Sequence, residues 1–185
     1  MARIVGISGS LRAKSFNTAL LRAAVEHMPA GVTLEVASIA GIPLYDGDVE
    51  AKDGIPAAVT ALKEKIIASD GVLIVTPEYN NSLPGVLKNA IDWLSRPPGD
   101  VPKVFIGRPV AVIGASPGPY GTILSQNAWL SVIRTLRMRP WFGARLMVAH
   151  ADKVFNEAGA LVDEGVRKQL QTFLKGYAEF VKAPH

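Results

Sequence analysis

Five short runs of mostly aliphatic and β-branched residues alternate with segments in which apolar residues recur every three or four positions. The runs cover residues 3–8, 33–39, 71–76, 109–115 and 141–148. The first, third and fourth runs are almost continuously apolar, which is typical of strands buried on both faces of a parallel sheet. An alternation of strands and helices of this kind predicts an α/β fold, in which helices cover both faces of an open parallel sheet.

The segments between the runs carry the apolar spacing of amphipathic helices. We expect helices over residues 17–28, 57–68, 86–94, 121–138 and 164–181. Pro56 and Pro84 stand where a first helical turn accepts proline. The longest stretches without a regular pattern are 41–55 and 96–108, which we expect to be loops. Because we find no internal repeat and no domain linker, the sequence predicts one domain over residues 1–185.

Composition limits the chemistry that such a domain can carry. The length of 185 residues lies within the ~100–200 residues that single domains commonly have. Hydrophobic residues make up 49% and charged residues 19% of the chain, which argues against disorder. The absence of cysteine excludes a disulfide framework, a thiolate metal site, an iron–sulfur cluster and a catalytic thiol. The net charge of +4 excludes an acidic electron-carrier surface and is too small to indicate nucleic-acid binding.

The amino-terminal sequence MARIVGISGS places one arginine before a short apolar run and a Gly-Ser turn. A signal peptide needs a continuous apolar region of ~7–15 residues and a small-residue cleavage site, and neither is present. No apolar run reaches the ~18 residues of a membrane span. We therefore expect a cytoplasmic protein with no membrane partner.

Three loops follow the predicted central strands. They cover residues 9–18, 76–85 and 116–121, and each combines small, polar and turn-forming residues with an aromatic residue. In an open parallel sheet, ligands bind outside the carboxyl ends of the strands. Because all three loops leave the same edge of the sheet, we expect them to form one ligand site.

The first loop resembles an anion cradle. The N-terminus of a helix presents free N–H groups and a positive dipole end, and both favour a phosphate. Ser10, Ser15 and Asn17 add neutral donors, and Arg12 can add a charge-assisted hydrogen bond. Neither a P-loop nor a Gly-x-Gly-x-x-Gly dinucleotide motif is present. The alternative is an ordinary helix start with a serine or asparagine cap.

The other two loops suit a flat ring with polar edges. The second offers Tyr79, amide side chains and backbone N–H groups between two prolines, and the third could present backbone N–H groups to carbonyl oxygens of the same ring. Each also has a simpler interpretation, as a rigid turn with a packed tyrosine and as a plain connection from a strand to a helix. The functional hypothesis rests on the convergence of the three loops.

Two long motifs carry a family resemblance. The first, over residues 9–17, reads GSLRxxSxN, and the second, over residues 76–93, reads TPEYNxSxPGxLKNAIDW. The chain resembles the NAD(P)H-dependent FMN reductases, a family that includes chromate, quinone and azo reductases. The resemblance implies a three-layer, flavodoxin-like, doubly wound α/β fold. Its five-stranded parallel sheet would have the order 2-1-3-4-5. It also implies dimers that often pair into tetramers.

The resemblance also implies a site for noncovalent FMN. The residues around its phosphate would be Ser10, Arg12, Ser15, Phe16 and Asn17. The residues around its isoalloxazine ring would be Pro77, Glu78, Tyr79, Asn80, Ser116 and Gly118. Thr122 stands where many relatives have a second glycine.

In the activity that the resemblance implies, NADPH or NADH passes a hydride to the flavin and leaves. A quinone, flavin, azo compound or metal oxyanion is then reduced, with ping-pong kinetics. No side chain is needed as nucleophile or general base, and no metal is expected. The alternative is a one-electron carrier of the flavodoxin type. A nucleic-acid module ranks lower, although four arginines lie close together in the chain. We expect those arginines at a subunit interface first: Arg134, Arg137, Arg139 and Arg145.

Overall fold

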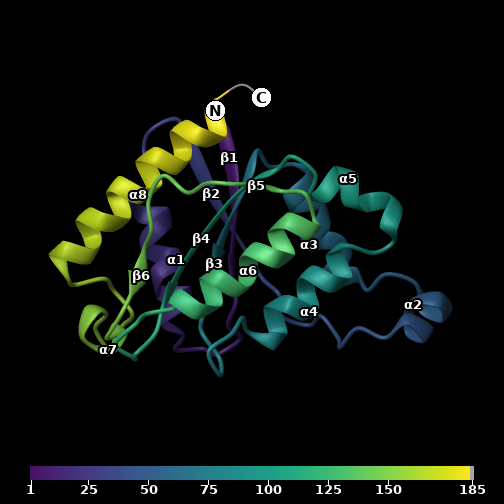
Figure 1. Cartoon of the computed structure of the whole chain (residues 1–185), viewed down its shortest axis with the longest axis horizontal. Coiled ribbons are helices and arrows are strands. Elements are labelled where there is room, and N and C mark those ends of the chain that lie inside the picture. The colour runs from purple at the N-terminus through teal and green to yellow at the C-terminus, as the bar shows by residue number, and fades with distance from the viewer. Residues whose placement is uncertain (184–185) are drawn as a thin grey trace.

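The computed structural model describes residues 1–183 and shows a parallel sheet between two layers of helices (Figure 1). The four longer strands are β1 (Ala2–Ser8), β2 (Val32–Ala37), β3 (Gly71–Val75) and β4 (Pro109–Ala115). The sheet order is β2-β1-β3-β4-β5, which confirms the predicted flavodoxin-like order. The α-helices are α1 (Phe16–Glu26), α2 (Gly47–Asp53), α3 (Ala57–Ile67), α4 (Gly85–Leu94), α5 (Val101–Val104), α6 (Ile123–Thr135), α7 (Ala151–Val154) and α8 (Glu164–Lys182), and η1 (Pro98–Asp100) is a 3-10 turn.

The prediction of one fifth strand over 141–148 was wrong. Two short strands replace it: β5 (Arg139–Pro140) pairs with the start of β4, and β6 (Met147–Val148) pairs with its end. Between them the chain leaves the sheet, and Trp141 packs edge-on against Phe173 with ring centroids 4.7 Å apart. The pairing with β4 extends to Trp141, whose N–H donates to the carbonyl of Val110 at 2.9 Å, and the chain departs from the sheet after this residue. The aliphatic run over 141–148 therefore indicates that the chain returns to the edge of the sheet here, but it does not reveal that the strand is divided into β5 and β6.

Two regions predicted as loops contain helices. Helix α2 lies within 41–55 and helix α5 within 96–108. Helix α2 has no buried residue, so apolar spacing could not reveal it. Its N-cap is Asp46, whose side chain accepts a hydrogen bond from the N–H of Asp48 at 2.9 Å. In Figure 1 this helix projects to the right of the sheet. No helix within residues 1–183 has both the length and the apolar character needed to cross a membrane.

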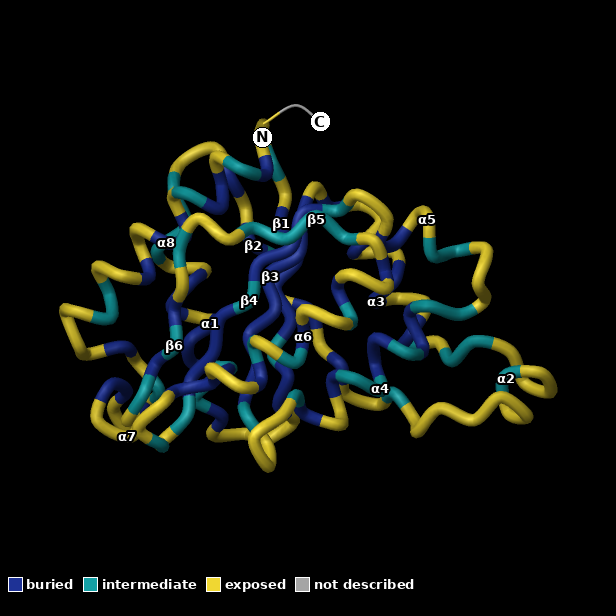
Figure 2. The backbone as a smooth tube through the Cα atoms, viewed as in Figure 1, coloured by how far each residue is buried: buried dark blue, intermediate teal, exposed yellow. Residues whose placement is uncertain are grey.

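Each face of the sheet has its own apolar core. Along β3, Leu73 and Val75 belong to a cluster with α1 and α8, whereas Val72 and Ile74 belong to a cluster with α3, α4 and α6. Side chains alternate between the faces of a strand. The buried strands form the centre of Figure 2. The continuous apolar runs are therefore explained by burial on both faces.

The register of the sheet brings the three loops together. Ser8 is the partner of Val75, and Val75 is the partner of Ile113. Strands β1, β3 and β4 therefore end at nearly the same level, at the lower edge of Figure 1. The loops that follow them leave from this one edge.

Candidate functional site

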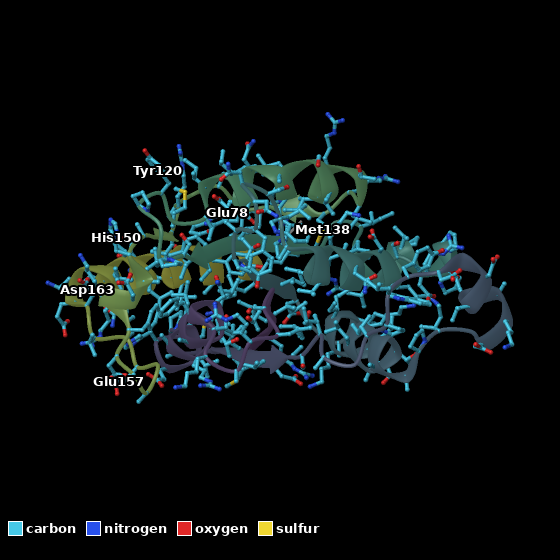
Figure 3. All side chains as sticks on the ribbon, turned by 90° about the horizontal axis from the view of Figure 1, so that it is seen from below. Glu78, Tyr120, Met138, His150, Glu157 and Asp163 are labelled. Atoms are coloured by element: carbon cyan, nitrogen blue, oxygen red, sulfur yellow. The ribbon has the colours of Figure 1, made fainter. Side chains whose placement is uncertain are left out.

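Backbone contacts join the first two loops at this edge. The N–H of Gly9 donates to the carbonyl of Val75 at 2.8 Å. A Cβ added to Gly9 would lie 2.9 Å from the ring of Pro77, closer than real Cβ atoms approach, and 3.0 Å from Leu87. Glycine is therefore required for the close approach of the two loops. Figure 3 views the molecule from this edge, with Glu78 and His150 among its labelled residues.

The first loop ends in a capped helix. Ser15 is the N-cap of α1, and its Oγ accepts from the N–H groups of Asn17 at 3.2 Å and Thr18 at 3.4 Å. The Oγ of Ser10 accepts from the N–H of Arg12 at 3.3 Å, and the hydroxyls of Ser10 and Ser15 are both in buried residues. Arg12 is exposed, and no carboxylate within residues 1–183 pairs with it. The donors suit an anion, since hydroxyls, a helix N-terminus and a free guanidinium meet here.

A groove of about 570 Å³ opens beside this helix start. Phe16 forms part of its wall and stacks on Phe155, with ring centroids 6.1 Å apart. Three cationic and two acidic side chains also line the groove: Arg12, Lys14, Arg22, Asp152 and Glu157. The groove gives an anion a path from solvent to the end of α1, and its excess of cations favours that approach.

The carboxamide of Asn17 lies inside the protein. Its Oδ1 accepts from the N–H of Ala115 at 2.9 Å, and its Nδ2 donates to the carbonyl of Ala115 at 2.9 Å. Asn17 is 3% exposed. Of the residues expected around the phosphate, this one has its side chain bonded to another strand.

The second loop contains a tight turn. Tyr79 and Ser82 exchange two backbone hydrogen bonds, of 3.1 and 3.0 Å. Between them Asn80 and Asn81 have φ values of 50° and 60°, as a type I′ turn requires, and asparagine tolerates this conformation well. The turn leaves Tyr79 41% exposed while Pro77 is buried. Tyr79 is thus available to a ligand without further rearrangement of the backbone.

The side chain of Glu78 caps helix α6. Its Oε2 accepts from the N–H of Leu124 at 2.9 Å and from the N–H of Ser125 at 3.0 Å. A buried network continues from there, since the Oγ of Ser125 lies 2.9 Å from the Oγ1 of Thr76, which accepts from the indole N–H of Trp129 at 3.0 Å. Glu78 therefore fastens the second loop to α6, and its backbone remains for contact with a ligand.

The third loop is fastened to the segment after β6. The hydroxyl of Ser116 donates to the carbonyl of Gly121 at 2.7 Å. The carbonyl of Ser116 accepts from the N–H of Ala151 at 3.1 Å, and that of Gly118 accepts from the N–H of His150 at 3.1 Å. Ser116 and Gly118 thus lie in a loop whose shape is set by local hydrogen bonds.

Thr122 has a packing role in this loop. It is fully buried, and its Oγ1 accepts from the side-chain amide of Gln126 at 3.1 Å. A Cβ added to Gly114 would meet this Oγ1 at 2.2 Å and the carbonyl of Thr76 at 2.1 Å. The departure from the family pattern at this position is therefore accommodated by the missing side chain of Gly114.

Several residues that organise the site were missed by the sequence analysis. They are Thr76, Ala115, Ser125 and Trp129. Only Thr76 belongs to a motif, and nothing in the local sequence indicates the partners of the others. Within residues 1–183, no three acidic, histidine or cysteine side chains gather as metal ligands would.

A second polar cluster holds the projecting helix α2. Glu50 accepts from the hydroxyl of Tyr45 at 2.9 Å and from the Nε of Arg96 at 2.8 Å. The hydrogen bond from Arg96 holds the pKa of Glu50 below its usual range, and the hydrogen bond to Glu50 raises the pKa of Tyr45. The cluster ties the 41–55 region to the end of α4.

Comparison of the sequence with known proteins identifies a family and several close relatives. The model of the family described as NADPH-dependent FMN reductase matches residues 2–153. An NAD(P)H-dependent FMN reductase of Pseudomonas aeruginosa is 42% identical over 180 residues, which cover 97% of this chain and 95% of that protein. A 2-hydroxy-1,4-benzoquinone reductase of a Burkholderia species is 39% identical, covering 97% and 96%.

Comparison with solved structures also identifies a flavoenzyme. FerB, a flavoenzyme NAD(P)H:(acceptor) oxidoreductase from Paracoccus denitrificans, has a TM-score of 0.87 with this chain at 31% identity, and the match covers 98% of each chain. Sequence and structure matches therefore cover almost the whole length, and the chain belongs to the NADPH-dependent FMN reductase family.

Proposed function

We propose that this protein is an FMN-dependent NAD(P)H oxidoreductase. The observation that carries the proposal is the start of α1, where the hydroxyls of Ser10 and Ser15, the helix N-terminus and Arg12, which pairs with no carboxylate within residues 1–183, lie beside the groove. This donor set fits the phosphate of FMN without a metal. FMN, when bound, accepts a hydride from NADPH or NADH and passes the electrons to an acceptor.

The residues of the other two loops would hold the ring. Tyr79 and Asn80 belong to the turn closed by the Tyr79–Ser82 hydrogen bonds, and Pro77 is buried shortly before it. Ser116 and Gly118 belong to a loop fastened to His150 and Ala151. The backbone is thus preorganised, so that little ordering cost accompanies binding. Glu78 contributes its backbone, because its carboxylate caps α6.

We propose a small-molecule acceptor and ping-pong kinetics. The exposure of Tyr79 supports an open site that NADPH or NADH and the acceptor enter in turn. The Burkholderia relative supports quinones as acceptors. Flavins, azo compounds and metal oxyanions are further candidates, which initial-rate kinetics with each acceptor would test. Parallel reciprocal plots are expected, and intersecting plots would contradict the ping-pong scheme.

We also propose that the protein forms a homodimer or a homotetramer. Two apolar surfaces support this. Leu44 (84% exposed) and Val49 (39%) lie on the projecting α2 region. Leu130 (40%) and Phe142 (69%) border a groove of about 370 Å³ that Arg145 also lines. A tetramer of this kind needs two different interfaces. Light scattering should give two or four chains per particle, and a monomer would refute the proposal.

The test of the proposed function is titration with FMN. Purified protein should quench flavin fluorescence, and anaerobic NADPH should bleach the bound flavin. Ser15→Asp keeps a good N-cap residue but places a carboxylate against the phosphate. It should weaken FMN binding at least about tenfold, equivalent to ~1.4 kcal/mol. The matched control is Ser38→Asp, because Ser38 also accepts a backbone N–H two residues ahead, at 3.1 Å, and lies outside the three site loops.

Three results would count against this function. Absence of flavin binding would refute it. Flavin that binds but is reduced by neither NADPH nor NADH would indicate a one-electron carrier. Equal FMN affinity in the Ser15 and Ser38 variants would remove Ser15 from the phosphate site.

A further inference from the structure

We propose that Asn17 is a positioning residue that couples the phosphate-binding end of α1 to the loop of residues 116–121. The inference rests on the proposed function, since it assigns the two ends of one FMN site. Its basis is the pair of 2.9 Å hydrogen bonds between the carboxamide of Asn17 and the backbone of Ala115, 98 residues away.

The carboxamide takes the place of a missing strand. The ladder between β3 and β4 ends at the pair Val75 and Ile113, and the N–H of Thr76 makes the last hydrogen bond, to the carbonyl of Ile113 at 2.8 Å. Ala115 lies beyond this end, with no β3 residue beside its peptide groups. A carboxamide carries one acceptor and one donor in a plane, as a peptide group does. Asn17 therefore satisfies Ala115 as a further residue of β3 would.

The position of this link couples two parts of the site. Asn17 lies two residues after Ser15, the N-cap at the phosphate end, and Ala115 directly precedes Ser116, the start of the third loop. Both hydrogen bonds are buried, where a lost partner costs more than at the surface. A shift of β4's end therefore displaces the start of α1, and the distance between the phosphate and ring contacts is maintained.

The affinities for FMN and riboflavin distinguish this positioning role from a direct contact between Asn17 and the phosphate. Riboflavin has the ring of FMN without the phosphate. Loss of a phosphate ligand weakens FMN alone. Loss of the link to Ala115 also weakens riboflavin, because the third loop, which contacts the ring, is then no longer held. Asn17→Ala should lower both affinities on the order of tenfold. Ser15→Ala, the comparison variant, should weaken FMN and leave riboflavin unchanged.

A control for simple destabilisation lies at the opposite edge of the sheet. The buried hydroxyl of Tyr177 donates to the carbonyls of Val72 at 2.7 Å and Pro109 at 3.1 Å, so it joins the starts of β3 and β4. Tyr177→Phe removes a buried link of the same kind far from the loops. It should lower the urea midpoint and leave both flavin affinities unchanged. If it weakened the flavins as Asn17→Ala does, the effect would be general and the proposal would fail.

A measurement without flavin keeps the inference testable on its own. In the apoprotein, the amide of Ala115 should be protected from hydrogen exchange, and Asn17→Asp, which lacks the donor to the Ala115 carbonyl, should expose residues 115–121. Unchanged exchange there would overturn the link. Loss of FMN binding with riboflavin binding intact would assign Asn17 to the phosphate instead. If the wild type bound no flavin, the proposed function would fail while the exchange experiment still tested the link.

Discussion

Replacement of Glu78 tests how the second loop is held. Two variants distinguish the hydrogen bonds that its carboxylate accepts from the effect of its negative charge. Glu78→Gln keeps an oxygen that can accept the N–H groups of Leu124 and Ser125 but removes the charge. Glu78→Ala removes both. Helix α6 depends on this side chain, because its own N-cap residue, Thr122, makes no side-chain cap hydrogen bond.

The expected loss follows from the two contacts of 2.9 and 3.0 Å. A side-chain cap contributes about 0.5–2 kcal/mol, and a negative charge near a helix N-terminus adds about 0.3–1 kcal/mol. We therefore expect Glu78→Gln to lower the free energy of unfolding by about 0.3–1 kcal/mol. Glu78→Ala should lower it by about 1–3 kcal/mol.

Urea unfolding of the apoprotein at neutral pH measures both losses. In about 1 M salt, where the Debye length is ~3 Å, the difference between wild type and Glu78→Gln should shrink. Glu64→Gln on the exposed face of α3 is the matched control, with an expected change within ~0.5 kcal/mol. A glutamine variant as unstable as the alanine variant, with no response to salt, would refute the role of the charge. An alanine variant within ~0.5 kcal/mol of wild type would refute the cap.

Three further predictions concern the scaffold. Tyr177→Phe should lower the free energy of unfolding by about 1–3 kcal/mol. Burial raises the pKa of Tyr177, so above pH ~10 the tyrosine ionises in the unfolded chain and the wild type loses stability. The variant should not show this loss. Gly114→Ala should unfold the protein or abolish FMN binding, since its Cβ would lie 2.1 Å from the carbonyl of Thr76; an unchanged urea midpoint with normal FMN affinity would contradict the packing. The hydrogen bond from Lys63 lowers the pKa of Asp100, so stability should fall as the pH drops below ~4, and in Asp100→Asn this part of the acid dependence should disappear.

The sheet could be predicted because its signal is local and strong. Each residue of β3 is buried, on one face or the other, so the run 71–75 is apolar throughout. The inference from an apolar run to a strand failed at the edge of the sheet. Residues 139–148 contain enough aliphatic side chains for a strand, yet the pairing with β4 stops after Trp141, whose N–H donates to the carbonyl of Val110 at 2.9 Å, and resumes only at β6. The side chain of Trp141 packs on Phe173 and Tyr177, a tertiary contact that the apolar pattern does not indicate.

The positions of the site loops could also be predicted, but not the partners of their side chains. Topology alone sends the loops after β1, β3 and β4 to one edge. The bonds of Asn17 to Ala115 and of Glu78 to Leu124 span 98 and 46 residues. A local motif contains no information about such partners, so both side chains were expected at a ligand.

The first motif therefore combines two kinds of residue that only geometry separates. Ser15 stands at the helix end, where its hydroxyl reaches the free N–H groups. Asn17 is two positions on, and because successive helical residues are about 100° apart, its side chain points to the opposite side of α1, toward β4. Threonine, asparagine or aspartate could replace Ser15 as a cap, but at position 17 aspartate lacks the donor that the carbonyl of Ala115 accepts from. The stricter requirement in this motif thus falls on the residue that meets the strand.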